Sequence, residues 1–103
     1  MMAVGASGVV SVVGNLVPKD VMGMIAAVLR NDWAAARAEH LKLFPLCRDL
    51  LGIAANPIPV KLAMAMLGRG NGEMRLPLCP PDERGLQGLR RSLERYGLLP
   101  LPE

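Results

Sequence analysis

Residues 6–15 read Ala-Ser-Gly-Val-Val-Ser-Val-Val-Gly-Asn, and this stretch decides the fold that the sequence predicts. Four valines and one serine stand between two glycines, a β-branched run bounded by turn residues that is typical of a buried parallel strand. No later stretch has comparable β character. Because a strand needs hydrogen-bonding neighbours, the sequence predicts one strand at Val9 to Val13 that requires a sheet this chain does not contain.

The rest of the chain has the pattern of helices separated by proline and glycine. Pro18 is favoured at the first position of a helix, and Asp32 is a strong N-cap for the next one. Pro45 falls inside that second helix and predicts a kink at residues 41–45. We expect four helices, at residues 18–30, 32–52, 59–68 and 81–96. The predicted fold class is therefore mainly α, with about four helices and one N-terminal strand.

Two stretches outside these helices are proline-rich. Residues 74–81 contain three prolines, which exclude a helix and argue against a paired strand. Residues 98–103 are apolar and are predicted to dock on the helices. Gly97 stands where a C-terminal glycine cap would end the last helix.

Composition narrows the class of protein. The chain has 103 residues, enough for one domain, and its net charge of +3 comes from interspersed charges rather than a basic face. This argues against nucleic-acid binding. The first seventeen residues carry no charged side chain, but no basic segment precedes the apolar run, and Gly, Ser and Asn interrupt it. A signal peptide or membrane anchor is therefore not expected.

The chain has two cysteines, Cys47 and Cys79, without the spacing of a metal site or the density of a disulfide-rich domain. We expect both to be reduced, buried or half-buried thiols that pack rather than react. This cysteine usage favours a cytoplasmic protein.

Three sequence blocks together carry a family resemblance. Residues 8–15 (Gly-Val-Val-Ser-Val-Val-Gly-Asn), 56–61 (Asn-Pro-Ile-Pro-Val-Lys) and 75–78 (Arg-Leu-Pro-Leu) follow one another in this order. In this they resemble the C-terminal part of the 4-hydroxy-tetrahydrodipicolinate synthase (dihydrodipicolinate synthase) family. The resemblance implies a (β/α)8, or TIM, barrel followed by a small helical domain. Residues 1–31 would be the last barrel strand and helix, and residues 32–103 the C-terminal helical domain.

The resemblance also implies an activity. The family are pyruvate-dependent class I lyases, usually tetrameric, which form a Schiff base and need no cofactor or metal. They condense pyruvate with aspartate semialdehyde in lysine and diaminopimelate biosynthesis. Val10 matches the family residue of the last barrel strand that lies against bound pyruvate. Gly8 and Ser11, on the same predicted strand, are secondary candidates.

The chain departs from the family pattern because it starts just before the last barrel strand. The family's Schiff-base lysine belongs to an earlier strand, and Lys19, Lys42 and Lys61 match nothing in that role. The chain has no threonine, and its one tyrosine, Tyr96, falls on the last predicted helix. We therefore expect no catalytic residue in this chain, no activity alone, and pyruvate binding only within a complete barrel. A homo-oligomer or an N-terminal barrel partner is expected.

Simpler interpretations of the polar residues stay open beside these. Lys61 at a helix start is expected to be structural or solvated, because the sequence around it offers neither the desolvating pocket nor the neighbouring cation that a catalytic lysine needs. His40 has no second ligand or nucleophile at a useful spacing and is expected to lie on a helix surface or to pack between helices. Arg90 and Glu94 are one turn apart and should pair. Two alternative functions remain: a small helical interaction or assembly module without catalysis, and a small membrane-associated protein that uses its first seventeen residues.

Overall fold

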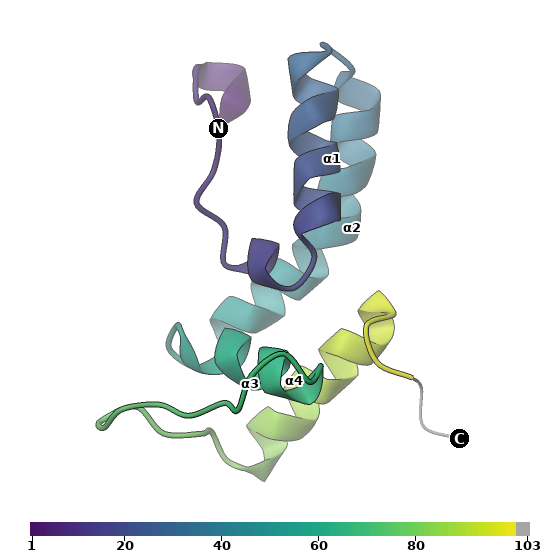
Figure 1. Ribbon diagram of the computed structural model, residues 1–103. Coiled ribbons are helices and arrows are strands. Elements are labelled where there is room, and N and C mark those ends of the chain that lie inside the picture. The colour runs from purple at the N-terminus through teal and green to yellow at the C-terminus, as the bar shows by residue number, and fades with distance from the viewer. Residues whose placement is uncertain (101–103) are drawn as a thin grey trace. The chain divides into compact units, whose positions relative to one another are not determined.

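The computed structural model describes residues 1–100 and confirms a mainly helical fold (Figure 1). Its four α-helices and two short 3₁₀ helices are η1 (Met2–Val4), η2 (Val13–Asn15), α1 (Pro18–Leu29), α2 (Trp33–Gly52), α3 (Ile58–Met66) and α4 (Glu83–Tyr96). Every end of the four α-helices falls within two residues of its prediction. The chain divides into two compact units, Met1–Phe44 and a second that begins at Pro45.

The predicted strand is the part of the fold that is not confirmed. Residues 6–11 have no regular secondary structure, and the 3₁₀ helix η2 begins at Val13. Val12, at the N-cap of η2, has helical backbone angles, φ −63° and ψ −50°. Residues 1–100 contain no strand at all. The physical reason is that a lone β-branched segment has no neighbouring strand to take up its backbone hydrogen bonds.

In the first unit, η2 leads into α1, and α1 is tied to the first part of α2. Pro18 stands at the start of α1 as predicted, and Lys42 Nζ lies 2.9 Å from Asp20 Oδ2. The turn between the helices uses Asn31 at a left-handed φ of 59°. Asp32 Oδ1 then accepts a hydrogen bond from Ala35 N–H at 3.0 Å, which confirms the predicted cap. The buried apolar residues of this unit are Val13, Leu16, Val17, Val21, Ala27, Ala36 and Leu43.

Pro45 lies inside α2, as predicted, and begins the second unit. The kink predicted at residues 41–45 stays a prediction. So does the division at residues 31 and 32, since it refers to the parts of a complete barrel and not to the compact units observed here.

The second unit is formed by the end of α2 with α3 and α4. Its buried apolar residues are Leu46, Leu50, Ile58, Pro59, Val60, Ala63, Leu89 and Leu93. Asp82 Oδ1 caps α4 by accepting a hydrogen bond from Gly85 N–H at 2.8 Å. At the other end Gly97 has a left-handed φ of 85°, and its N–H donates to Glu94 O at 2.9 Å. Both ends of α4 are thus closed by its own flanking residues.

Gly85 inside α4 has a packing reason. A Cβ atom at this position would lie 2.8 Å from Pro81 Cβ, too close for any other residue without a shift of the backbone. The glycine therefore lets the first turn of α4 lie against the proline that precedes it, although glycine costs helical stability relative to alanine.

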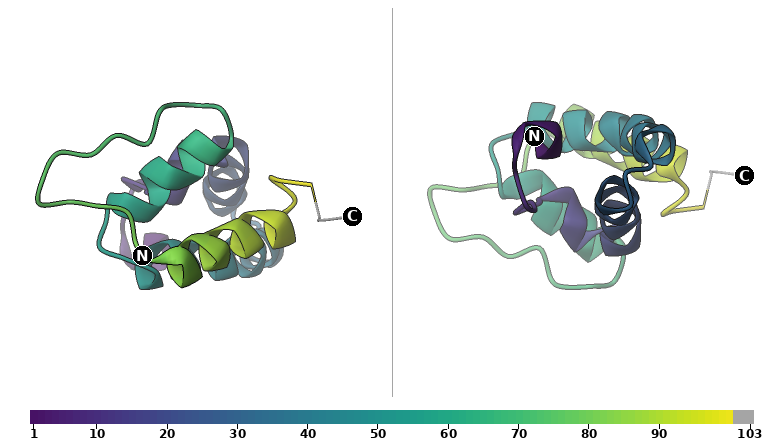
Figure 2. Two further views of the ribbon diagram at one scale, coloured as in Figure 1. Left: turned by 90° about the horizontal axis from the view of Figure 1, so that it is seen from below. Right: turned by 90° about the horizontal axis from the view of Figure 1, so that it is seen from above.

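The segment between α3 and α4 forms a wide loop (Figure 2). It contains neither helix nor strand over residues 74–81, as predicted. After α4, Leu98 N–H donates to Leu93 O at 2.9 Å, so the tail begins against the helix. Residues 101–103 of the predicted docked tail lie outside the described residues. No helix among residues 1–100 is both long enough and apolar enough to cross a membrane.

Candidate functional site

Val10, the one predicted substrate contact, lies in the irregular segment before η2. Its side chain is fully exposed, at 106%, so no neighbouring group contacts it. Gly8 is exposed as well, whereas Ser11 is half-buried and its Oγ accepts a hydrogen bond from Gly14 N–H at 3.0 Å. The structure therefore does not gather these three residues into a pocket. Their predicted roles stay predictions.

The lysines provide no activated amine. Lys42 donates to Asp20, and this hydrogen bond raises the pKa of Lys42 above its ordinary value. Desolvation opposes the shift, and the charges of Asp20 and Glu39 support it. A Schiff-base nucleophile needs the opposite shift. Lys19 and Lys61 are exposed to solvent, as expected for structural or solvated lysines.

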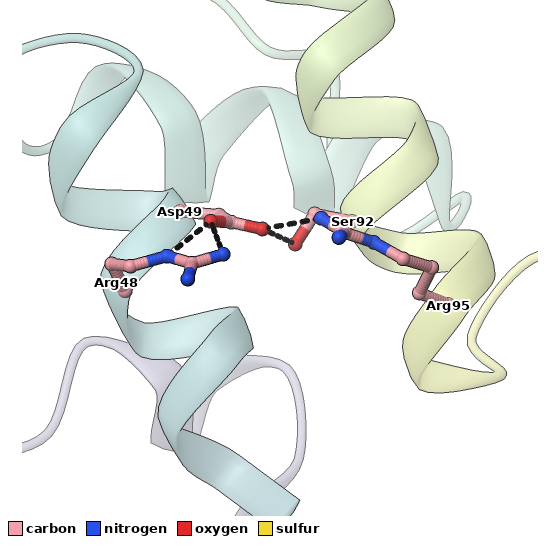
Figure 3. A network of polar contacts seen from close by, with 4 residues as sticks. All are labelled: Arg48, Asp49, Ser92 and Arg95. Carbon is pink, nitrogen blue, oxygen red and sulfur yellow. Dashed lines mark hydrogen bonds and ion pairs between the residues drawn. The ribbon is translucent and has the colours of Figure 1, made fainter.

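The main polar cluster of the second unit is a network of four residues between α2 and α4 (Figure 3). Asp49 Oδ1 accepts from Arg48 Nε at 2.9 Å and from Arg48 Nη2 at 2.8 Å. Asp49 Oδ2 accepts from Ser92 Oγ and from Arg95 Nη2, both at 2.8 Å. Both carboxylate oxygens are thus occupied, which indicates a structural tie between the helices rather than a binding site.

Asp49 is held in its charged form. Its side chain is only 15% exposed, and this burial alone would raise its pKa. The hydrogen bonds from Arg48 and Ser92, together with the charges of Arg48 and Arg95, outweigh burial and lower the pKa. This network was not predicted from the sequence. The available signal was Ser92, a polar residue on the apolar face of α4 that carries Leu89 and Leu93.

A groove of about 930 Å³ lies between the start of α3 and the loop that precedes α4. Pro57 and Lys61 line one side, and residues 71–76 and 78–80 line the other. Lys61 and Arg75 bring positive charge to it, and Glu73 brings negative charge. The lining is otherwise largely apolar.

The two cysteines are free thiols in different surroundings. Cys47 is half-buried, and burial raises the pKa of its thiol, which disfavours the reactive thiolate. Cys79 is exposed, so the prediction that both would be at least half-buried is wrong for Cys79. The reason is its position in the loop before α4, where prolines prevent a packed helix. Residues 1–100 hold no group of three or more side chains that could bind a metal ion.

His40 and Arg90 have the surroundings that the sequence predicted. His40 is exposed on α2, with its ring centroid 5.9 Å from that of Phe44. Arg90 Nε lies 3.1 Å from Glu94 Oε1, which confirms the predicted pair. Neither residue is part of a wider constellation that could carry chemistry.

Comparison with known proteins shows which family this chain is similar to. Residues 1–96 match the sequence profile of the Dihydrodipicolinate synthetase family. A 4-hydroxy-tetrahydrodipicolinate synthase of Methanocaldococcus jannaschii is 46% identical over 99 residues, covering 96% of this chain and 34% of that protein. The similarity predicted from the three sequence blocks is therefore confirmed.

Solved structures agree with the sequence comparison. The crystal structure of dihydrodipicolinate synthase from Aquifex aeolicus superposes with a TM-score of 0.91 at 43% identity, over 99% of this chain and 34% of that one. The dihydrodipicolinate synthase of Thermotoga maritima gives a TM-score of 0.89 at 39% identity, over 95% of this chain and 33% of that one. The chain thus spans about a third of the length of the relatives that it matches.

Proposed function

Because this chain belongs to the Dihydrodipicolinate synthetase family, we propose that it is the C-terminal part of a pyruvate-dependent class I lyase. The complete enzyme would condense pyruvate with aspartate semialdehyde in lysine and diaminopimelate biosynthesis. The observation that carries this proposal is the match over nearly the whole chain to 4-hydroxy-tetrahydrodipicolinate synthases, at up to 46% identity among the relatives described above. Its coverage of 34% of such a relative limits the proposal to a part of the enzyme.

Within a complete barrel, residues 8–13 would be the last strand, and Val10 would contact pyruvate. Active sites of such barrels lie at the carboxyl ends of the strands. Alternate residues of a strand face opposite sides, so Val10 and Val12 would share one side and Ser11 the other. The exposed apolar side chain of Val10 supports this role, because it is free to pack against the methyl group of pyruvate once neighbouring strands surround it.

We expect this chain to have no activity alone. In a Schiff-base lyase, a lysine amine attacks the carbonyl carbon of pyruvate, a C–N bond forms, and water leaves to give the imine. The amine must be uncharged to attack. The ion pair with Asp20 favours the charged form of Lys42, and Lys19 on α1 and Lys61 on α3 are exposed to solvent.

Exposed apolar side chains support association with another polypeptide. Val9 and Val10 before η2, and Met22 and Leu29 on α1, are all more than half exposed. Apolar surface of this kind is commonly covered by a partner. The partner would be further copies of this chain or a polypeptide that supplies the N-terminal strands of the barrel. The free thiols of Cys47 and Cys79 favour the cytoplasm as the location.

Borohydride trapping tests this proposal directly. We expect pyruvate and sodium borohydride to leave the mass of the purified chain unchanged, because no lysine forms an imine that borohydride could reduce. The complete Methanocaldococcus jannaschii relative is the positive control and should gain one reduced pyruvate per chain. A stoichiometric adduct on Lys19, Lys42 or Lys61 of the isolated chain would contradict the proposal.

A further inference from the structure

We draw no further inference here: the strongest candidate, the groove between the start of α3 and the loop that precedes α4, carries none because nothing in the structure shows what occupies it.

Discussion

Helix α4 and residues 6–15 are both strong sequence patterns, yet only α4 forms the element that its pattern predicts. In α4, Asp82 closes the first turn and Gly97 closes the last, so the helix takes up its own backbone hydrogen bonds. The valine run has no such closure. Residues 6–11 are irregular, and Val10 is fully exposed.

The two patterns differ in where the backbone hydrogen-bond partners lie along the chain. A helix pairs backbone groups four residues apart, so local sequence is sufficient once one face is buried. A strand pairs with residues that belong to another segment. Residues 6–15 have a strand pattern without a partner strand among residues 1–100, whereas α4, α3 and the end of α2 form a compact unit.

The largest expected difference in stability is between a buried side chain of α4 and an exposed side chain of the valine segment. Leu93→Ala should lower the free energy of unfolding by about 2–5 kcal/mol, because Leu93 is fully buried in the second unit. Val10→Ala should change it by less than about 0.5 kcal/mol, because the side chain contacts nothing in the isolated chain. Urea unfolding followed by far-UV circular dichroism measures both. A loss at Val10 as large as at Leu93 would mean that the valine segment is already packed.

A middle-sized effect is expected at the network between α2 and α4. Asp49→Ala removes the acceptor for Ser92, which is buried, and for two arginines. A buried donor left without its partner costs about 1–3 kcal/mol, and urea unfolding at neutral pH should show a loss of that size. A loss below the error of the measurement would show that solvent replaces Asp49 without cost.

The same network gives a pH dependence whose sign follows from Asp49. Its pKa is lower in the folded chain than the ordinary value of 3.8. The stabilisation is therefore fully present above that ordinary value and is lost as pH falls through the lower folded pKa. Asp49→Asn is the matched control, because an amide does not titrate. If the unchanged chain and the Asp49→Asn variant lose stability identically as the pH falls, then Asp49 is not the cause of the pH dependence.

The smallest effect is expected at the caps. Asp82→Ala should cost about 1 kcal/mol through loss of the bond to Gly85 N–H, and Asp82→Asn should restore most of it, because asparagine is an equally good N-cap. Asn15→Ala, in the first region, should cost less than about 0.5 kcal/mol, because its bond to Val12 O is exposed. Thermal unfolding followed by circular dichroism ranks the three. An equal loss of stability for Asp82→Ala and Asn15→Ala would show that the cap of α4 stabilises the chain no more than the exposed bond of Asn15 does.

The sequence predicted those features that depend on neighbours along the chain. The caps at Asp32 and Gly97 were predictable because each acts on residues within one turn of itself. The pair of Arg90 with Glu94 was predictable because residues four apart share a helix face.

Features that join distant segments were not predictable from pattern. Ser92 and Asp49 are 43 positions apart, and nothing local shows that their side chains meet. The exposure of Cys79 depends on the loop around it. Val10 came from the family resemblance alone, and residues 1–100 bring no second group beside it that could define a site.

Amide hydrogen exchange at residues 8–13 tests whether this segment becomes a paired strand only when neighbouring strands are supplied. It would be measured on the isolated chain and after co-expression with the part of the Methanocaldococcus jannaschii relative that precedes the matching region. We predict exchange near the unstructured rate in the isolated chain and at least about 100-fold slower exchange in the complex, because strand pairing protects backbone amides. Protection already present in the isolated chain, or a complex that forms without protecting these residues, would contradict the account.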